Sequence, residues 1–193
     1  MAKAFKSTHR GLTCHLEKAE RDLLRSLFED VVTMLEPEPP VSGAADEDPL
    51  WAVVGMDPRA HAVDFAAPTD DAVLRLLPDA VRDDAEASLE FRRLTERGLR
   101  EAKVGALRAA ALAVETSPVL LAPGTAPKFA AALNDVRLVL AQRLGLETEE
   151  DAARVHAFDD WSAAENVDEY LALVYNFVTW LQESLMQALN ESL

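Results

Sequence analysis

The sequence predicts a mainly α-helical single domain, a helical bundle that begins with a β-hairpin. Over most of the chain, apolar residues recur at three- and four-residue steps, which is the period of an amphipathic helix. The first residues instead alternate around a glycine, as a hairpin does. With 193 residues and 49% hydrophobic content, the chain can bury one sizeable core. We therefore expect one domain over 1–193, with its helical core over 69–193.

The hairpin is predicted over 1–17. A two-residue turn at Arg10 and Gly11 would bring directly opposed residues onto one face. The resulting pairs are His9 with Leu12, Ser7 with Cys14 and Phe5 with Leu16. Cys14 then lies on the inward face as a small hydrophobic side chain, and a redox role is the alternative. It is the only cysteine, so an internal disulfide and a multi-cysteine zinc site are excluded.

A helix is predicted over 18–36, where the prolines that follow end it. Its apolar stripe consists of Leu24, Leu27, Phe28, Val31 and Leu35. The stretch 37–50 is rich in proline and acidic residues, and we expect a mobile acidic loop there. Thr69 is then predicted to cap a short helix that ends at Pro78.

The stretch 82–115 is predicted to form one long helix, or two helices joined near Gly98. One stripe narrows to small residues in its middle, and two glycines on it indicate that a neighbouring helix packs closely there. The stripe consists of Phe91, Leu94, Gly98, Ala102, Gly105, Ala109 and Leu112. The outer face carries Arg93, Arg97 and Arg100. These arginines form either a solvated helix face that suits the helix dipole or a basic ridge that binds an acidic partner.

Residues 129–151 have the outline of a helix-turn-helix. Gly145 is predicted to end the first helix, and Thr148 to cap the second. A DNA-reading helix lies against phosphates, but this turn and second helix carry four acidic residues and one arginine. These charges oppose contact with phosphates, so a direct DNA-binding regulator that uses 138–155 is the alternative and not the leading hypothesis.

The last helix is predicted to begin at Asn166, with Glu169 as its capping partner. It carries a wide apolar arc, so we expect it at the centre of the core. Its aromatic residues Tyr170, Tyr175 and Trp180 either pack as ordinary core side chains or line a ligand pocket.

The net charge and the absence of known catalytic motifs restrict the classes of function that the sequence allows. The 34 acidic residues outnumber the 19 basic ones, giving a net charge of −15 that opposes general binding to nucleic acid or anionic membrane. Glycine-rich phosphate loops, HExxH and GxSxG are absent from the sequence, so we predict no enzymatic activity, metal or cofactor. The apolar stretches fall short of the roughly 20 residues that span a bilayer, and the first residues lack a signal-peptide core. We expect a cytoplasmic protein.

The N-terminal hairpin and four segments that follow it together resemble the actinobacterial family catalogued as domain of unknown function 2017 (DUF2017). The four segments are LLRSLFEDVVTMLE, LLPDAVRDDAEASLEFRRLTERGLREAK, LNDVRLVLAQRLGL and YNFVTWLQESL. The resemblance covers nearly the whole chain. It implies a cytosolic protein often encoded beside the adaptor of the Clp protease. Some members are described as oxidative-stress transcriptional regulators (AosR) that act through a sigma factor. A thiol switch within one chain needs two cysteines, and this chain has only Cys14.

We therefore expect a non-enzymatic interaction or regulatory protein that acts by binding a protein partner. The resemblance implies that this partner belongs to the transcription or Clp proteolysis machinery, and that the protein is an oxidative-stress transcriptional regulator or an accessory protein of Clp proteolysis. Arg93, Arg97 and Arg100 would meet acidic groups of the partner.

Overall fold

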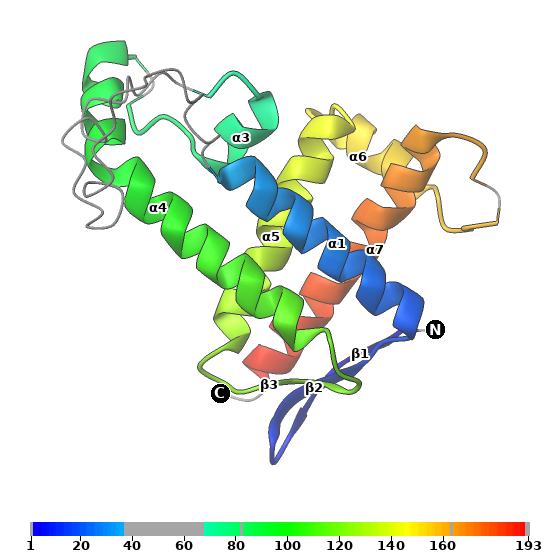
Figure 1. The fold of residues 1–193 in the computed structure, drawn as a ribbon. Coiled ribbons are helices and arrows are strands. Elements are labelled where there is room, and N and C mark those ends of the chain that lie inside the picture. Colours follow the sequence, from blue (N-terminus) through cyan, green and yellow to red (C-terminus); the bar gives the residue numbers. More distant parts are fainter. Residues whose placement is uncertain (1, 37–67, 82, 163, 192–193) are drawn as a thin grey trace, which may run out of the picture.

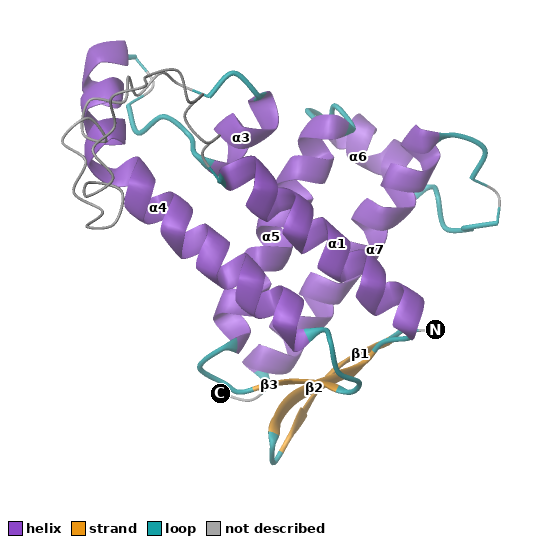
Figure 2. Cartoon of the chain, viewed as in Figure 1, coloured by secondary structure: helices purple, strands orange, loops and turns teal. Residues whose placement is uncertain are grey.

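The computed structural model describes residues 2–36, 68–81, 83–162 and 164–191. The stretch predicted as an acidic loop, 37–50, lies outside the described residues. Within them the chain forms six helices and a three-stranded antiparallel sheet (Figure 1). Figure 2 shows the sheet at one end of the helices. The predicted fold class, mainly α with an N-terminal hairpin, is confirmed.

Two pairs of helices make the body of the fold. The strands are β1 (Lys3–Thr8), β2 (Gly11–His15) and β3 (Val119–Leu121), and the helices are α1 (Lys18–Leu35), α3 (Asp71–Leu76), α4 (Ala85–Ala113), α5 (Ala126–Arg143), α6 (Glu149–His156) and α7 (Val167–Asn190). Helix α1 packs on α4 and α5 packs on α7, while α5 also contacts both α1 and α4 (Figure 1). Strand β1 packs on α7, so the sheet covers one end of these helices. None of the helices in the described ranges is both long and apolar enough to cross a membrane.

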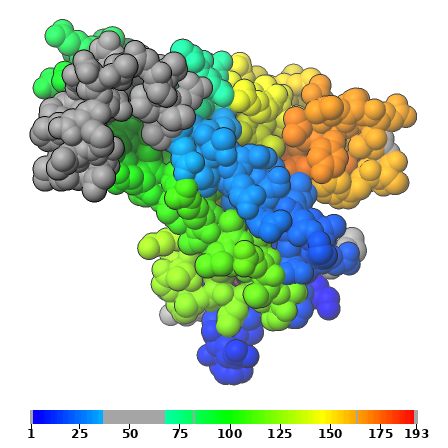
Figure 3. All heavy atoms as spheres, viewed as in Figure 1, coloured from blue at the N-terminus to red at the C-terminus, as the bar shows by residue number. Residues whose placement is uncertain are grey.

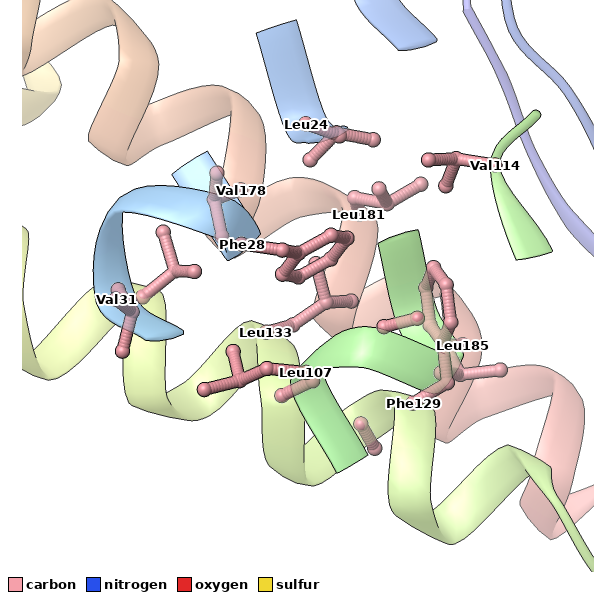
Figure 4. Packing of buried hydrophobic residues seen from close by; sticks show 14 of the residues in the cluster. Leu24, Phe28, Val31, Leu107, Val114, Phe129, Leu133, Val178, Leu181 and Leu185 are labelled. Carbon is pink, nitrogen blue, oxygen red and sulfur yellow. The ribbon is translucent and has the colours of Figure 1, made fainter. Parts of the chain in front are cut away.

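The core lies where α1, α4, α5 and α7 meet (Figure 4). Phe129 of α5 is at its centre, because the rings of Phe28 and Phe5 both meet it edge to face, at centroid distances of 5.9 and 6.0 Å. Leu181 of α7 is fully buried beside them. Burying such a side chain contributes about 1.5–3 kcal/mol. Helix α7 buries a broad apolar face in the core, as expected, but the helix at the centre is α5, which contacts α1, α3, α4 and α7.

The hairpin has a different register from the one predicted. Its turn consists of His9 and Arg10, and Ser7 is opposite Leu12 rather than Cys14. The cause is a third strand that the sequence analysis missed. Strand β3 pairs with β2, and Gly11 has φ of +120° where a Cβ would lie 2.4 Å from the carbonyl oxygen of Leu121. Gly11 is therefore fixed at the start of β2, where this close approach requires a glycine.

Helix α4 is turned the opposite way from the prediction. The stripe that contains Gly98 and Gly105 faces outward, where Phe91 is 52% exposed, Leu94 79% and Leu112 66%. Among the described residues, no atom comes within 4 Å of a Cβ placed at either glycine. The prediction that a neighbouring helix of the same chain packs there is wrong. The buried face carries Ser88, Arg92, Glu96, Leu107 and Ala110 instead.

Polar residues can occupy the inner face of α4 because they bind one another. The guanidinium of Arg92 donates to Glu96 at 2.6 Å, to Asp79 at 2.7 Å and to the carbonyl oxygen of Leu77 at 3.2 Å. Glu96 in turn accepts a hydrogen bond from Arg100 at 2.8 Å. A buried charge is tolerated when it is paired and hydrogen-bonded, as these are.

Most helix ends follow the predicted caps. Thr148 caps α6, Asn166 caps α7, and Gly145, with φ of +64°, follows the end of α5. The cap of α3 is Asp70 rather than Thr69. Its carboxylate accepts from the N–H of Ala72 at 2.9 Å and from Arg143 at 2.6 Å, which a threonine hydroxyl cannot do equally well. Asp70 therefore joins α3 to the end of α5.

Candidate functional site

An aromatic groove lies between the start of α1, the middle of α7 and the loop that joins α6 to α7. Figure 3 shows the joining segment, in orange, at the surface beside α1, in blue. Two adjoining hollows form the groove and share Glu20, Trp161 and Phe177. The larger hollow is open to solvent, and its volume, with the solvent at its mouth included, is about 930 Å³. Five aromatic side chains line it, namely Phe158, Trp161, Tyr170, Phe177 and Trp180.

The groove aromatics are arranged in two pairs. The rings of Phe177 and Trp180 are stacked, with centroids 6.3 Å apart and planes at 25°. The rings of Trp161 and Tyr170 meet edge to face, 5.7 Å apart and at 75°. Trp161, Tyr170 and Trp180 are 48%, 45% and 38% exposed. Exposed apolar side chains gathered in one patch mark interaction sites on soluble proteins.

The groove has an acidic rim, and the chain segment that forms one side of it is strongly acidic. Nine acidic residues lie within 147–169, against Arg154 alone among lysines and arginines. Glu20 and Asp159 line the groove directly. Asp160 accepts hydrogen bonds from the hydroxyl and the N–H of Ser162, at 2.6 and 2.8 Å, and these bonds hold the pKa of its carboxyl below the ordinary value. The carboxyl of Asp160 therefore remains negative well below neutral pH. In the described residues, no three His, Cys, Asp or Glu side chains are grouped so that they could hold a metal ion.

Asn176 of α7 positions the groove loop. Its side-chain amide donates to the carbonyl oxygens of Val155 and Phe158, at 2.8 and 2.9 Å. These bonds fasten the end of α6 and the first part of the loop to α7. The Oδ1 of Asn176 is buried, and within the described parts of the chain it has no hydrogen-bond partner. Sequence reasoning missed this residue, although it interrupts the apolar arc of the last helix.

The structure brings together two of the three predicted pocket aromatics. Tyr170 and Trp180 line the groove. Tyr175 does not, because it is partly buried against the core, with its ring 6.3 Å from His156 and the guanidinium of Arg137 5.7 Å from its centroid. Phe158 and Trp161 were missed since they lie in a loop, where helical periodicity carries no information. The aromatic and acidic run FDDW at 158–161 was the signal that could have indicated them.

The three arginines of the predicted partner interface do not form one free basic ridge. Arg93 and Arg97 are exposed, and Arg97 pairs with Glu101 at 2.9 Å. The side chain of Arg100 is only 21% exposed. It donates to Glu96 and to the carbonyl oxygen of Leu35, at 2.8 Å in each case. Arg100 is therefore held by the fold, and the basic character of this surface is smaller than the sequence indicated.

Cys14 is buried in the sheet. Its Sγ donates to the carbonyl oxygen of Lys3 at 3.0 Å. Burial, followed by the nearby charge of Glu20, raises the pKa of the Cys14 thiol to about 12. A reactive cysteine requires the opposite, a lowered pKa and access to solvent. This environment favours the structural interpretation of Cys14 over the redox one.

The segment considered for DNA binding does form a helix, a turn and a helix. Its second helix, α6, has eight residues. Asp151 accepts from the hydroxyl and the N–H of Thr148, at 2.8 and 2.9 Å, and from the N–H of Glu147 at 3.2 Å. These hydrogen bonds lower the pKa of Asp151 to about 2. A carboxylate thus already occupies the helix N-terminus, where a phosphate would otherwise bind, and Glu149 and Glu150 add to the repulsion.

Comparison with known proteins gives one match. No curated protein and no solved structure matches this chain. The family model described as domain of unknown function (DUF2017) matches residues 2–189. The match runs from the hairpin to the end of α7, and it therefore includes every element that builds the groove. The chain belongs to the DUF2017 family.

Proposed function

We propose that this protein is a non-enzymatic interaction module of the cytoplasm, and that it binds a basic, apolar-faced segment of a partner protein in the aromatic groove. The observation that carries the proposal is the coincidence of exposed aromatic rings and an acidic rim in one hollow. Large aromatic side chains dominate the binding energy of protein interfaces. Lysine and arginine side chains also bind favourably over the faces of tryptophan and tyrosine rings.

The shape of the groove favours a protein segment over a small molecule. Small-molecule sites are enclosed enough to bury most of their ligand. This groove is open, and it continues from Leu23 of α1 across Trp161 to Trp180 of α7. An amphipathic helix that lays one face into a groove matches such a surface. The acidic rim would attract the basic face of that helix and increase its rate of association.

The family resemblance supplies a proposal for the partner's identity. In this proposal the partner belongs to the transcription or Clp proteolysis machinery, and an oxidative-stress regulator that acts through a protein partner fits an interaction module. In this proposal the protein acts by binding its partner and not by oxidation of Cys14, because that thiol is buried and has a raised pKa. Direct DNA binding receives less support, since α6 presents carboxylates where phosphates would lie.

Titration calorimetry with two synthetic helical peptides tests the proposal. The peptides share their length and apolar residues, and one carries lysine and arginine where the other carries glutamate. We expect the basic peptide to bind and the acidic peptide not to bind. The binding should weaken as salt screens the rim charges. Combined Trp161→Ala and Tyr170→Ala substitutions should abolish it, and Asp159→Lys should weaken it.

A matched control distinguishes binding in the groove from nonspecific binding to any exposed aromatic side chain. Phe91→Ala removes an aromatic ring that is also exposed, but on α4. We expect this variant to bind the basic peptide as the unmodified protein does. Equal binding of both peptides would overturn the proposal. So would full binding by a groove variant that melts at the same temperature as the unmodified protein.

A further inference from the structure

We infer that the outer face of α4 is the interface between two copies of this chain, which meet with their α4 helices antiparallel. Four exposed charged residues lie along one side of α4, namely Glu90, Arg97, Glu101 and Arg108. They are separated by seven, four and seven residues. Because seven and four residues are close to two turns and one turn, the four side chains share a single strip of the helix. Their signs alternate along it.

This charge pattern changes sign when the helix is reversed about Leu99. Reversal places Glu90 where Arg108 was, and Arg97 where Glu101 was. In an antiparallel pair with a two-fold axis at Leu99, the same side of both helices comes together. Each acidic residue then lies beside a basic residue of the other copy, which gives four complementary contacts. A parallel pair in register would place like charges together instead. The second copy is therefore the occupant that the charges of α4 fit.

An apolar strip runs beside these charges and supplies the contact area. Phe91, Leu94 and Leu112 are 52%, 79% and 66% exposed, which is unusual for large apolar side chains of one helix. In the antiparallel pair, Leu94 of one copy lies over the gap between Ala102 and Gly105 of the other. The small residues leave room for it, so the two helix axes can approach closely.

The length of α4 determines how stable the dimer is expected to be. Its 29 residues extend about 43 Å at 1.5 Å per residue. A contact between two helices of this length lies near the lower limit of stable interfaces, which is about 1,200 Å² in total. We therefore expect a reversible dimer that dissociates on dilution. Arg97 already pairs with Glu101 in its own chain, and Arg108 with Glu36, so the dimer would extend these pairs into a shared network.

Sedimentation of the full chain over a range of concentrations tests this inference. Glu90→Arg places two arginines together at each end of the strip, and Arg108→Glu places two glutamates together. We expect each variant alone to raise the dissociation constant about tenfold or more. An equal mixture of the two variants should recover dimers, because every contact is then between opposite charges. Arg93→Glu, an exposed arginine of the same helix that lies off the strip, serves as the matched control.

A second probe leaves all charges unchanged. Gly98→Leu should fold, since no atom of the described residues lies within 4 Å of a Cβ at that position, but it should keep the two helices apart and raise the dissociation constant. A protein that stays monomeric at every concentration would overturn the inference. A dimer that persists in all these variants, or a mixture that does not recover dimers, would do so too. The groove on α1 and α7 is a separate surface, so this inference and the proposed function fail independently.

Discussion

The guanidinium of Arg100, on α4, donates a 2.8 Å hydrogen bond to the carbonyl oxygen of Leu35, the last residue of α1. The final carbonyls of a helix lack partners within it, and a cation is favourable at that end of the helix dipole. Arg100 also binds Glu96, which binds Arg92. This chain of ion pairs connects α4 to α1 and explains why charged side chains face inward on α4.

Arg100 and Arg93 should therefore respond differently to substitution. Arg100→Ala leaves Glu96 with one fewer partner in a buried position, and we expect it to lower the free energy of unfolding by about 3 kcal/mol. Arg93→Ala removes an exposed side chain, and we expect a change within about 0.5 kcal/mol. Urea denaturation of both variants gives the comparison. Equal losses would contradict the role assigned to Arg100.

The core position of α7 predicts a large effect at Leu181. This side chain is fully buried, so Leu181→Ala should lower the free energy of unfolding by about 2–5 kcal/mol through lost burial and a new cavity. Denaturant melting measures this loss. A value under about 1 kcal/mol would show that α7 is peripheral.

Gly11 should not tolerate a side chain. It has φ of +120°, and an added Cβ would lie 2.4 Å from the carbonyl oxygen of Leu121. Gly11→Ala should destabilise the fold by about 1–3 kcal/mol, because β2 and β3 must separate or the backbone must remain strained. Thermal melting of Gly124→Ala is the control, since no described atom lies within 4 Å of a Cβ at that position. A Gly11→Ala variant as stable as its control would refute the close approach of β3.

The thiol of Cys14 should be unreactive in the folded protein. Its folded pKa is about 12, raised from an ordinary 9.0, so the folded state keeps the proton more tightly than the unfolded state. This group's contribution to stability is thus complete below pH 9 and is lost as pH rises towards 12. Modification by a thiol reagent should be slow in the native state and fast in urea. Equal rates in both states would show that the site opens readily.

The elements of the fold could be predicted from the sequence better than their orientations. The period of α1 and α7 identified the faces that are buried, because their apolar residues are the ones that pack. The same reasoning exchanged the buried and exposed faces of α4, where the apolar Phe91 and Leu94 face outward. The pattern of apolar residues cannot predict that Arg92 and Glu96 form an ion pair with each other in the interior. Strand β3 has three residues, too few for any alternating pattern.

The candidate site could be predicted only in part. Tyr170 and Trp180 lie on one helix, where the sequence analysis grouped them as aromatic residues, but the same grouping included Tyr175, which packs against the core. Trp161 and Phe158 come from a loop, and Glu20 comes from α1, so only the tertiary fold brings them to the groove. Asn176 fastens the loop to α7 through two backbone carbonyls, and such a contact has no signature in the sequence.

Site-specific photo-crosslinking tests the central claim most directly. A photoreactive phenylalanine derivative is placed at position 161 in the groove, or at position 91 on α4 as the control, and the protein is irradiated in native cytosol. Mass spectrometry then identifies the linked peptides. The account predicts that position 161 links to one basic, apolar-faced segment of a partner protein, and that position 91 links to α4 of a second copy and not to that partner. Position 161 linking to acidic or unrelated segments, or to the same proteins as position 91, would contradict it.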